Sequence, residues 1–266
     1  MDPHGIITHL QSWMRNYALK EEKGGFVVGV SGGVDSAVCS TIAARTKLPV
    51  LCLDMPIHQD PAEAERAHDH CIRLTRDHPL VEHLVLDLTG HYDQFIARMG
   101  PRKGADEQLA LAAVNTKSRL RLAALYYHAT ARNFLVLGTG NRVEQRGVGF
   151  FAKYGDGGMD LAPLTDLLKS EMYRLAEALE IDPRIIQAQP TDGLWPDRRT
   201  DLEQIGATYP ELEWAMDLRE GGADTGSMEL DPRQQEVLRI YDTRHADNRH
   251  KRLDPPEGPI PRSLRR

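Results

Sequence analysis

The chain has 266 residues, which is enough for one α/β domain of generous size or two small ones, and we expect one. Hydrophobic residues make up 41% and charged residues 27%, a balance that excludes a largely disordered chain. The net charge of −6 disfavours nucleic acid as a partner, and no apolar run approaches the ~20 residues that span a bilayer. We therefore expect a cytoplasmic protein that binds small anionic ligands, with no nucleic-acid or membrane partner.

Helices and strands are expected to alternate in the first half of the chain. In chain order, the predicted elements are a helix around 6–17, a strand at 26–30, a helix at 35–45, a strand at 50–53, a helix at 61–76, a strand at 83–88, a helix at about 106–132 and a strand at 134–137. This βαβ rhythm predicts a doubly wound parallel sheet with helices on both faces, a Rossmann-like α/β fold.

The second half of the sequence is less regular. The stretch FFAKYGDGGMD at 150–160 predicts a Gly-rich loop, 166–179 a helix, QPTDGLWPDRRTD at 189–201 a polar loop, and 232 to about 248 a last helix. The final stretch RLDPPEGPIPRSLRR is typical of an extended, poorly ordered tail. The predicted organisation is a single domain over residues 1–252, followed by this tail at 253–266.

The stretch FVVGVSGGVDSAV at residues 26–38 joins the first strand to a helix through a Gly pair. Such a pair permits positive φ and leaves backbone N–H groups uncovered, which suits an anion. Val34, Asp35 and Ser36 follow, without the lysine of the usual phosphate loop. Ligands of parallel sheets bind at the carboxyl ends of strands, so the pattern indicates a phosphate beside a divalent cation held by Asp35. The alternative is a plain helix start with Ser31 as N-cap.

Read as a whole, SGGVDS resembles the pyrophosphate-binding loop of the ATP pyrophosphatases, which adenylate a substrate and release pyrophosphate, on a sheet of the adenine nucleotide alpha hydrolase type. Further stretches narrow the choice. They are NTKSRLR at 115–121, GTGNRVE at 138–144, FFAKYGDGGMDLAPL at 150–164, PTDGLW at 190–195 and HKR at 250–252. In this order they resemble the motifs of the ammonia-dependent NAD synthetases, and they cover most of the chain from residue 25 to 252.

The resemblance implies an activity, ligands and an assembly. The enzyme would be a ligase forming a C–N bond, amidating deamido-NAD with ammonia and with ATP as co-substrate, to give NAD, AMP and pyrophosphate through an adenylated intermediate. This is the last step of NAD biosynthesis. Mg²⁺ is the implied cofactor, and a homodimer the implied assembly. Free ammonia is the expected nitrogen donor, unless a partner chain delivers it, because the chain is too short to include the glutaminase domain of the larger NAD synthetases.

The same resemblance assigns roles to individual residues. The implied ATP contacts are Gly29, Val30, Ser31, Gly32, Gly33, Val34, Asp35, Ser36, Thr139, Lys169 and Thr191, and the implied magnesium ligands are Asp35 and Glu144. The residues expected to hold deamido-NAD are Arg119, Lys153, Asp160, His250 and Lys251. We hypothesise that Asp156 binds ammonium and helps to deprotonate it, with Ser31 nearby, so the expected catalytic residues are Asp156, Ser31 and Lys169.

Two stretches depart from the family pattern. In EQRGVGFFAK the step from Glu144 to Lys153 is nine residues, where the commoner form of the family has eight. The loop LDMPIHQDP, at 53–61, lacks the Arg-x-Pro-Tyr signature of many members. The backbone after Glu144 and the adenine contacts at 54–61 are therefore expected to differ.

Other readings stay open at this point. The chain could be another adenylating ATP pyrophosphatase, such as an amidotransferase synthetase or a tRNA-modifying enzyme, or a non-catalytic ATP-binding protein of the same fold. A tRNA enzyme would need a more basic surface, and the presence of Asp35, Glu144 and Lys169 disfavours a degenerate site.

Some chemically suggestive residues have plainer explanations. A zinc site around His68, His70 and Cys71 is disfavoured, because His70 would lie on another face of the helix, and these histidines are expected at the surface. The three cysteines lack a metal-binding spacing and are expected to be buried. The large aromatic residues Trp195, Tyr209 and Trp214 are expected to pack, without a role at a ligand.

Overall fold

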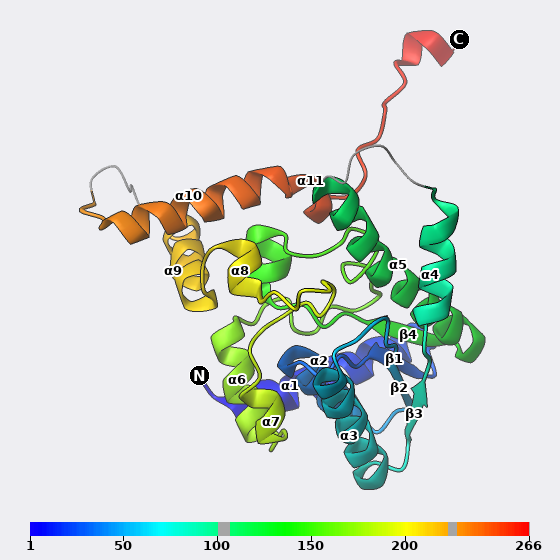
Figure 1. The fold of residues 1–266 in the computed structure, drawn as a ribbon. Coiled ribbons are helices and arrows are strands. Elements are labelled where there is room, and N and C mark those ends of the chain that lie inside the picture. Colours follow the sequence, from blue (N-terminus) through cyan, green and yellow to red (C-terminus); the bar gives the residue numbers. More distant parts are fainter. Residues whose placement is uncertain (101–106, 223–227, 266) are drawn as a thin grey trace.

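Four short parallel strands form the centre of the computed structural model, which describes residues 1–100, 107–222 and 228–265 (Figure 1). They are β1 (Gly25–Gly29), β2 (Val50–Asp54), β3 (Val81–Val85) and β4 (Phe134–Leu137), in the order β3-β2-β1-β4. Val27 of β1 lies opposite Leu51 of β2 on one side and Val136 of β4 on the other. The predicted parallel sheet is confirmed.

The strand predicted at 83–88 starts two residues earlier and ends three residues earlier, at Val81–Val85. Its register follows from the pairing of Val50 with Val81. Leu84 and Val85 are exposed at the edge of the sheet, so the apolar run that suggested a strand does not coincide with its buried residues. The prediction of a strand was right, and its bounds were wrong.

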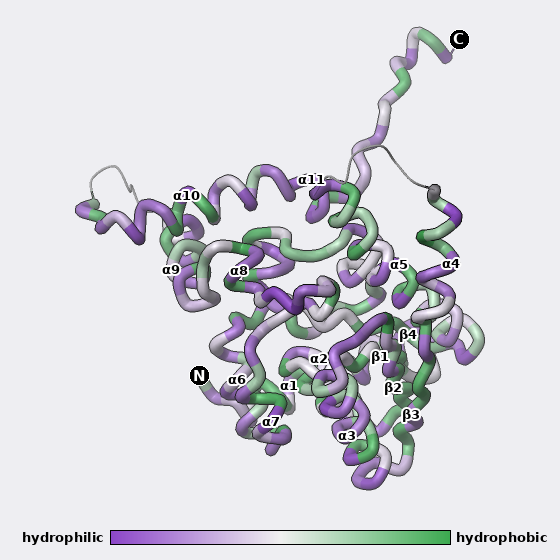
Figure 2. Tube along the Cα trace, in the orientation of Figure 1, coloured by the Kyte–Doolittle hydropathy of each residue, from purple (hydrophilic) through white to green (hydrophobic). Residues whose placement is uncertain are grey.

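Helices cover both faces of the sheet, as predicted. One face packs against α1 (Pro3–Lys20), α2 (Val34–Arg45), α3 (Pro61–Asp77) and α6 (Lys169–Ala178), and the other against α4 (Thr89–Arg98) and α5 (Glu107–Arg132). Successive residues of β1 alternate between the two cores, with Phe26 and Val28 in the first and Val27 in the second. Figure 2 shows the resulting hydrophobic colour along the central strands.

Helix α6 begins at Lys169, three residues later than the predicted start at 166. The residues before it are bonded to the segment after β4, through Gly138 N to the carbonyl of Leu161 and Arg142 N to that of Leu167. Their backbone therefore runs beside the sheet instead of forming a helical turn. The N–H of Leu168 is capped by the Glu171 carboxylate at 2.9 Å.

A third cluster of hydrophobic side chains lies apart from the sheet. It joins a π-helical segment η1 (Val143–Val148) to α9 (Tyr209–Glu220) and α10 (Pro232–Asp247). The remaining short elements are α7 (Pro183–Ile186), α8 (Asp201–Ile205), α11 (Arg249–Arg252) and η3 (Arg262–Arg265). Helix α10 was predicted, whereas α9 was missed, although Thr208 and Glu211 form a capping box at its start.

No helix in the described parts of the chain is long and apolar enough to cross a membrane. After α11 the backbone has neither helix nor strand over residues 253–261, and it ends in the 3₁₀ turn η3. This segment is exposed and extends away from the rest of the molecule (Figure 1). The single domain at 1–252 and the poor order of the tail stay predictions.

Candidate active site

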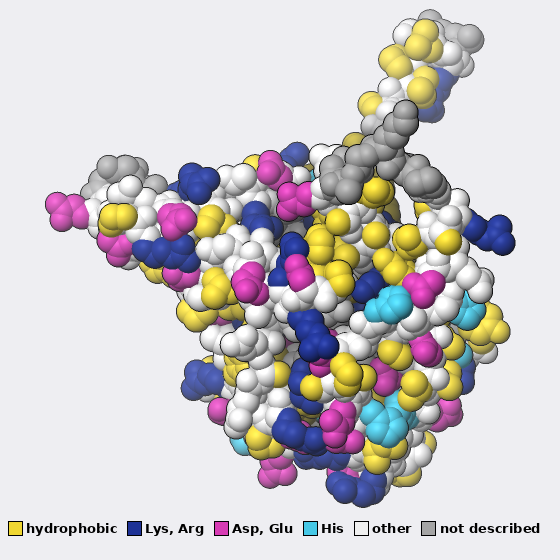
Figure 3. Space-filling model, viewed as in Figure 1, with side chains coloured by type: hydrophobic (Ala, Val, Ile, Leu, Met, Phe, Trp, Pro, Cys, Tyr) yellow, Lys and Arg dark blue, Asp and Glu magenta, His cyan; other side chains and the backbone are white. Residues whose placement is uncertain are grey.

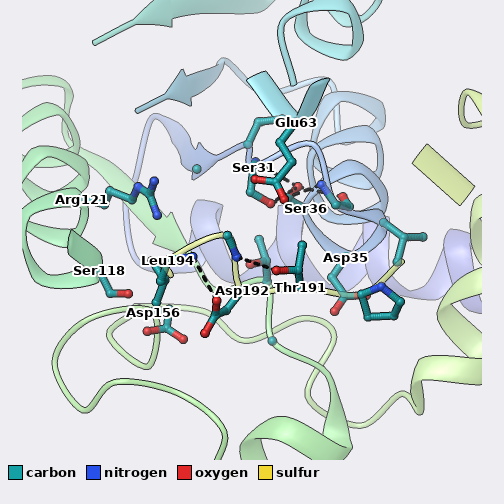
Figure 4. A pocket seen from close by; sticks show the side chains of 18 of the residues that line it. Ser31, Asp35, Ser36, Glu63, Ser118, Arg121, Asp156, Thr191, Asp192 and Leu194 are labelled. Carbon is teal, nitrogen blue, oxygen red and sulfur yellow. Dashed lines mark hydrogen bonds between the residues drawn. The ribbon is translucent and has the colours of Figure 1, made fainter. Parts of the chain in front are cut away.

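A pocket lies at the carboxyl ends of β1, β2 and β4, where the predicted phosphate loop is found. Its wall includes the turn after β1, the segment after β4, the start of α6 and the polar loop at 189–201. Figure 4 shows Ser31 and Ser36 on one side of this pocket and Asp156 with Ser118 on another, with Thr191 and Asp192 between them. Residues far apart in the sequence thus face one cavity.

The turn after β1 is built by its glycines and serines. Gly32 has φ +82°, and a Cβ added there would clash with the carbonyl oxygen of Glu63 in α3. Ser36 donates to the carbonyl of Gly33 at 2.9 Å and lies 3.2 Å from the Ser31 hydroxyl. Helix α2 begins directly after this turn without a side-chain cap, so its first N–H groups are available to an anion.

Lys169 occupies the centre of a buried charged cluster beside this turn. Its Nζ lies 2.8 Å from Asp35 Oδ2 and 3.7 Å from Glu144 Oε1. Burial raises the pKa of Glu144 to about 7, against the lowering effect of Lys169. Burial also acts to lower the pKa of Lys169, but the carboxylates of Asp35 and Glu144 outweigh it and raise that pKa. The ammonium therefore stays charged.

Tyr209, expected only to pack, also lies against this cluster. Its side chain is buried in the third hydrophobic cluster, and its hydroxyl lies 2.6 Å from Glu144 Oε1 and 2.9 Å from Asp201 Oδ2. A phenol has one proton, so it can donate to one of these carboxylates at a time. Burial raises the pKa of Asp201 to about 6. Asp201 was missed because it lies at the end of a polar loop with no motif to mark it.

Asn141 completes the cluster from within the GTGNRVE motif. It is fully buried, and its Nδ2 donates to Asp35 Oδ2 at 3.0 Å. Its Oδ1 accepts from the N–H of Glu144 at 3.2 Å. The Asn141 side chain therefore contacts both predicted magnesium ligands. In the sequence, the only sign of this role is that Asn141 lies between Asp35 and Glu144.

Negative charge is in excess around this pocket. Among the described residues that line it, the basic ones are Arg66, Arg121 and Lys169, and the acidic ones are Asp35, Asp54, Glu63, Glu144, Asp156, Asp192 and Asp201. One carboxylate oxygen each of Asp35 and Asp201 is buried without a hydrogen-bond partner. A divalent cation would satisfy such oxygens and offset the charge, so the donor set suits Mg²⁺. No group of three or more His, Cys, Asp or Glu side chains is arranged as a metal site in the described ranges.

The backbone that follows Asn141 and Arg142 forms a π-helical segment, Val143–Val148. A π-helical turn is wider than an α-helical turn and is often found at functional sites. Glu144 still faces Lys169, and the Gly147 carbonyl accepts from His245 Nδ1 at 2.8 Å. The effect of the extra residue on the aim of Glu144 stays a prediction, and in this structure Glu144 lines the pocket.

The loop after β2 is held by Arg121, another residue that sequence reasoning missed. Arg121 Nε donates to the carbonyl of Met55 at 2.9 Å, and its Nη2 donates to Gln59 Oε1 at 2.7 Å. Arg121 belongs to the NTKSRLR motif, so a basic group reaches this loop from α5. The missing Arg-x-Pro-Tyr signature therefore does not leave the loop without a cation.

The predicted ATP contacts and the predicted deamido-NAD contacts fall into two groups. Thr139, Lys169, Thr191 and most of the turn at 29–36 line the pocket, and Asp156 lines it as well. Arg119, Lys153, Asp160, His250 and Lys251 lie outside its lining. The second group surrounds the Gly-rich loop: Lys153 Nζ donates to the His250 carbonyl at 2.6 Å, and Lys251 Nζ to that of Phe151 at 2.8 Å.

The glycines of this loop allow it to lie directly on α5. A Cβ added to Gly155 would lie 2.7 Å from Cβ of Ser118, and one added to Gly158 would lie 2.5 Å from Leu122. Asp156, between them, accepts from the N–H of Ala152 at 3.0 Å, and burial raises its pKa. A carboxyl group with a raised pKa is suited to exchange a proton.

The histidines and cysteines hold no further site in the described residues. The three cysteines are buried, as predicted. His68 is exposed, but His70 is buried, with Nε2 2.9 Å from the Ser40 hydroxyl, so the surface prediction was wrong for His70. The contact is internal to the α2–α3 packing, and burial lowers the pKa of His70 to about 4.

A glycine turn that leads from the first strand into an uncapped helix start, beside a carboxylate–lysine cluster, defines a nucleotide-binding α/β protein of the ATP pyrophosphatase class. The chain matches the NAD synthase family over residues 6–255 and belongs to that family.

Individual relatives agree with this assignment. The chain is 35% identical to the NH(3)-dependent NAD(+) synthetase of Syntrophomonas wolfei, over the whole of both chains. It is similar in structure to the NMN synthetase of Francisella tularensis, with a TM-score of 0.82 and 27% identity over 98% of this chain and all of the other. The NAD+ synthetase of Burkholderia pseudomallei gives a TM-score of 0.70 and 27% identity, over 93% and 90% of the two chains.

Proposed function

We propose that this chain amidates deamido-NAD with ammonia at the expense of ATP, forming NAD, AMP and pyrophosphate. The observation that carries the proposal is the cluster of Asp35, Glu144 and Lys169 beside the glycine turn. In a chain of the NAD synthase family, this cluster supports the proposal because its lysine would attract the phosphates of ATP and its carboxylates would hold a cation beside them.

Amide formation from a carboxylate requires activation, because a carboxylate is a poor electrophile and its oxygen a poor leaving group. In the proposed reaction the nicotinate carboxylate attacks the α-phosphorus of ATP, and pyrophosphate leaves. Ammonia then displaces AMP from the adenylated carboxyl group. The N–H groups at the start of α2 and the Lys169 ammonium would stabilise the charge on the departing phosphates.

Asp35 and Glu144 are the residues that would hold Mg²⁺, and the unpartnered oxygen of Asp35 supports this assignment. When bound, the cation would neutralise negative charge on the leaving pyrophosphate. Lys169 lies between the two carboxylates, so it would keep them from repelling each other before substrates arrive.

Asp156 is our candidate for the group that receives the proton of ammonium. Ammonium dominates at neutral pH and has no free electron pair, so the reaction needs an acceptor close to the adenylated carboxyl group. Asp156 lines the pocket from the Gly-rich loop, next to the predicted deamido-NAD contacts. Ser31, on the glycine turn, lines the same cavity and would face the phosphates.

Deamido-NAD would lie along the side chains of Arg119, Lys153, Asp160, His250 and Lys251. The proposed location of the enzyme is the cytoplasm.

We propose that the chain works as a homodimer. Helix α5, which carries Arg119, also exposes Leu111 and Tyr127. Figure 3 shows hydrophobic side chains gathered over α5. A second copy that covered this helix would bury them close to the substrate. Sedimentation analysis would test the assembly, and a monomer at micromolar concentration would contradict it.

The activity is tested by incubating the protein with Mg-ATP, ammonium and deamido-NAD and measuring NAD, AMP and pyrophosphate. We expect the three products in equal amounts. Formation of ADP in place of AMP, or no NAD at all, would contradict the proposal.

A second candidate substrate is the mononucleotide that lacks the adenylate half. The similarity to the Francisella NMN synthetase, over nearly the whole of both chains, favours testing it. The same carboxylate would be activated in either substrate, so the ATP pocket does not discriminate between them. The ratio of kcat/KM for deamido-NAD to that for nicotinate mononucleotide shows which of the two is the preferred substrate. We expect deamido-NAD to be preferred.

A further inference from the structure

Three basic side chains line the nucleotide pocket in the described structure, and two of them are already engaged. Lys169 is held by Asp35 and Glu144, and Arg121 donates to the loop after β2. The third, Arg66, extends from α3 towards the glycine turn. The turn itself has no lysine, so the charge on bound phosphates has to be offset by side chains from elsewhere.

Arg66 contacts the turn directly. Its Nε donates to the carbonyl of Gly32 at 3.3 Å. This part of α3 lies so close to the turn that a Cβ on residue 32 would clash with the Glu63 carbonyl and would lie 3.3 Å from Cβ of Arg66. The guanidinium is therefore positioned at the turn by the same packing that requires a glycine there.

The terminal nitrogens of Arg66 make no hydrogen bond with the described part of the chain. Within these ranges, the one hydrogen bond of Arg66 is the bond from Nε, and the side chain forms no ion pair. A guanidinium has five N–H donors, and its two terminal nitrogens match the oxygens of a phosphate group. The side chain is half-buried at the edge of the pocket, so a ligand can reach it.

We infer that Arg66 binds the leaving pyrophosphate of ATP, with Nε held by Gly32 and the terminal nitrogens on phosphate oxygens. The inference rests on the proposed function for the identity of the ligand. The phosphates would then lie between two cations: Lys169, beside the carboxylate cluster on one side of the turn, and Arg66, on the α3 side.

Glu63 allows a second test, because its charge is opposite to that of Arg66 and should have the opposite effect on pyrophosphate binding. It lies one helical turn before Arg66, also lines the pocket, and is close enough for Arg66 to lower its pKa, although burial raises it overall. A carboxylate at this place repels a phosphate, whereas the guanidinium attracts it. Neutralising the two residues should therefore change pyrophosphate binding in opposite directions, which a purely structural role of α3 would not do.

The test is calorimetric titration of the full chain with Mg-pyrophosphate, in the absence of ATP and deamido-NAD. We expect Arg66→Gln to weaken binding by roughly tenfold or more, because a charge-assisted bidentate contact is lost. Glu63→Gln should tighten binding. The matched control is Arg76→Gln, on the same helix but 72% exposed and paired with Asp77, and it should bind as the wild type does.

Equal binding by the Arg66→Gln and Arg76→Gln variants would overturn the inference. Should Arg66→Gln fail to fold, the Arg66→Lys variant provides the test, because its single side-chain nitrogen cannot contact both the Gly32 carbonyl and the phosphate. We expect this variant to bind Mg-pyrophosphate several-fold more weakly than the wild type. Binding equal to that of the wild type would overturn the inference. The measurement needs no turnover. If NAD is not formed but Arg66→Gln still weakens binding, the proposed function fails while the Arg66 contact stands.

Discussion

Lys169 Nζ lies 2.8 Å from Asp35 Oδ2, and this contact joins the first residue of α6 to the first turn of α2. Both side chains are largely buried, with 8% and 13% of their surfaces exposed. The usual phosphate loop carries its lysine within the motif. Here the lysine comes from a helix 134 residues further along the chain, and it is paired with a carboxylate that the usual loop lacks.

Replacing Lys169 with methionine should destabilise the protein and abolish most of its activity. Asp35 and Glu144 would be left buried without their cation, which costs about 3 kcal/mol in unfolding free energy. NAD formation should fall by roughly 100-fold or more, since the phosphates lose a charge partner. Urea unfolding and product assays measure both effects. Lys20→Met, at an exposed position, is the control, and equal stability of the two variants would contradict the account.

Replacing Tyr209 with phenylalanine should lower turnover while preserving the fold. The change removes the hydroxyl that contacts both Glu144 and Asp201, at a cost of about 1 kcal/mol in unfolding free energy. Turnover should fall about tenfold, because Glu144 loses a bond that orients it. Tyr17→Phe removes a hydroxyl at the exposed end of α1 and should leave turnover unchanged. Identical kinetics of the two variants would show that the Tyr209 hydroxyl has no functional role.

Asp156→Asn should slow the use of ammonia and spare the binding of ATP. The amide keeps the size of the side chain but cannot accept a proton from ammonium. We expect kcat to fall with a nearly unchanged dissociation constant for ATP, measured by calorimetry. Asp166→Asn, at an 80% exposed position, is the control. Wild-type turnover of the Asp156→Asn variant would refute the assigned role.

His70 should make the protein less stable in mild acid. Burial lowers its pKa from 6.5 to about 4. Below pH 6.5 the unfolded chain takes up a proton that the folded chain accepts only near pH 4, so the unfolding free energy falls as the pH drops through this window. The shift corresponds to about 3 kcal/mol.

The pH profile of a variant isolates this contribution. Between pH 7.5 and 4.5, the unfolding free energy of the His70→Gln variant should change less than that of the wild type. The His9→Gln variant, altered at an exposed position, should follow the wild-type curve. Parallel curves for the wild type and His70→Gln would mean that the folded protein does not hold this histidine neutral.

The sequence predicts the parallel sheet and the glycine turn after its first strand well, because both follow from local patterns. Buried apolar runs mark β1, β2 and β4, and the Gly pair with Asp35 marks the turn. Tyr209, Asp201 and Arg66 are not found in this way, since each reaches the pocket through packing between elements distant in sequence. The motif that contains Glu144 was recognised, but its π-helical backbone required the structure.

The central claim is that the nicotinate carboxyl group is adenylated before ammonia attacks. It is tested most directly with deamido-NAD whose carboxylate carries ¹⁸O, in the presence of Mg-ATP and ammonium. When the carboxylate oxygen attacks the α-phosphorus and ammonia then displaces AMP, one labelled oxygen leaves with AMP. The account predicts one ¹⁸O in AMP for each NAD formed, and AMP free of label, or label in inorganic phosphate, would contradict it.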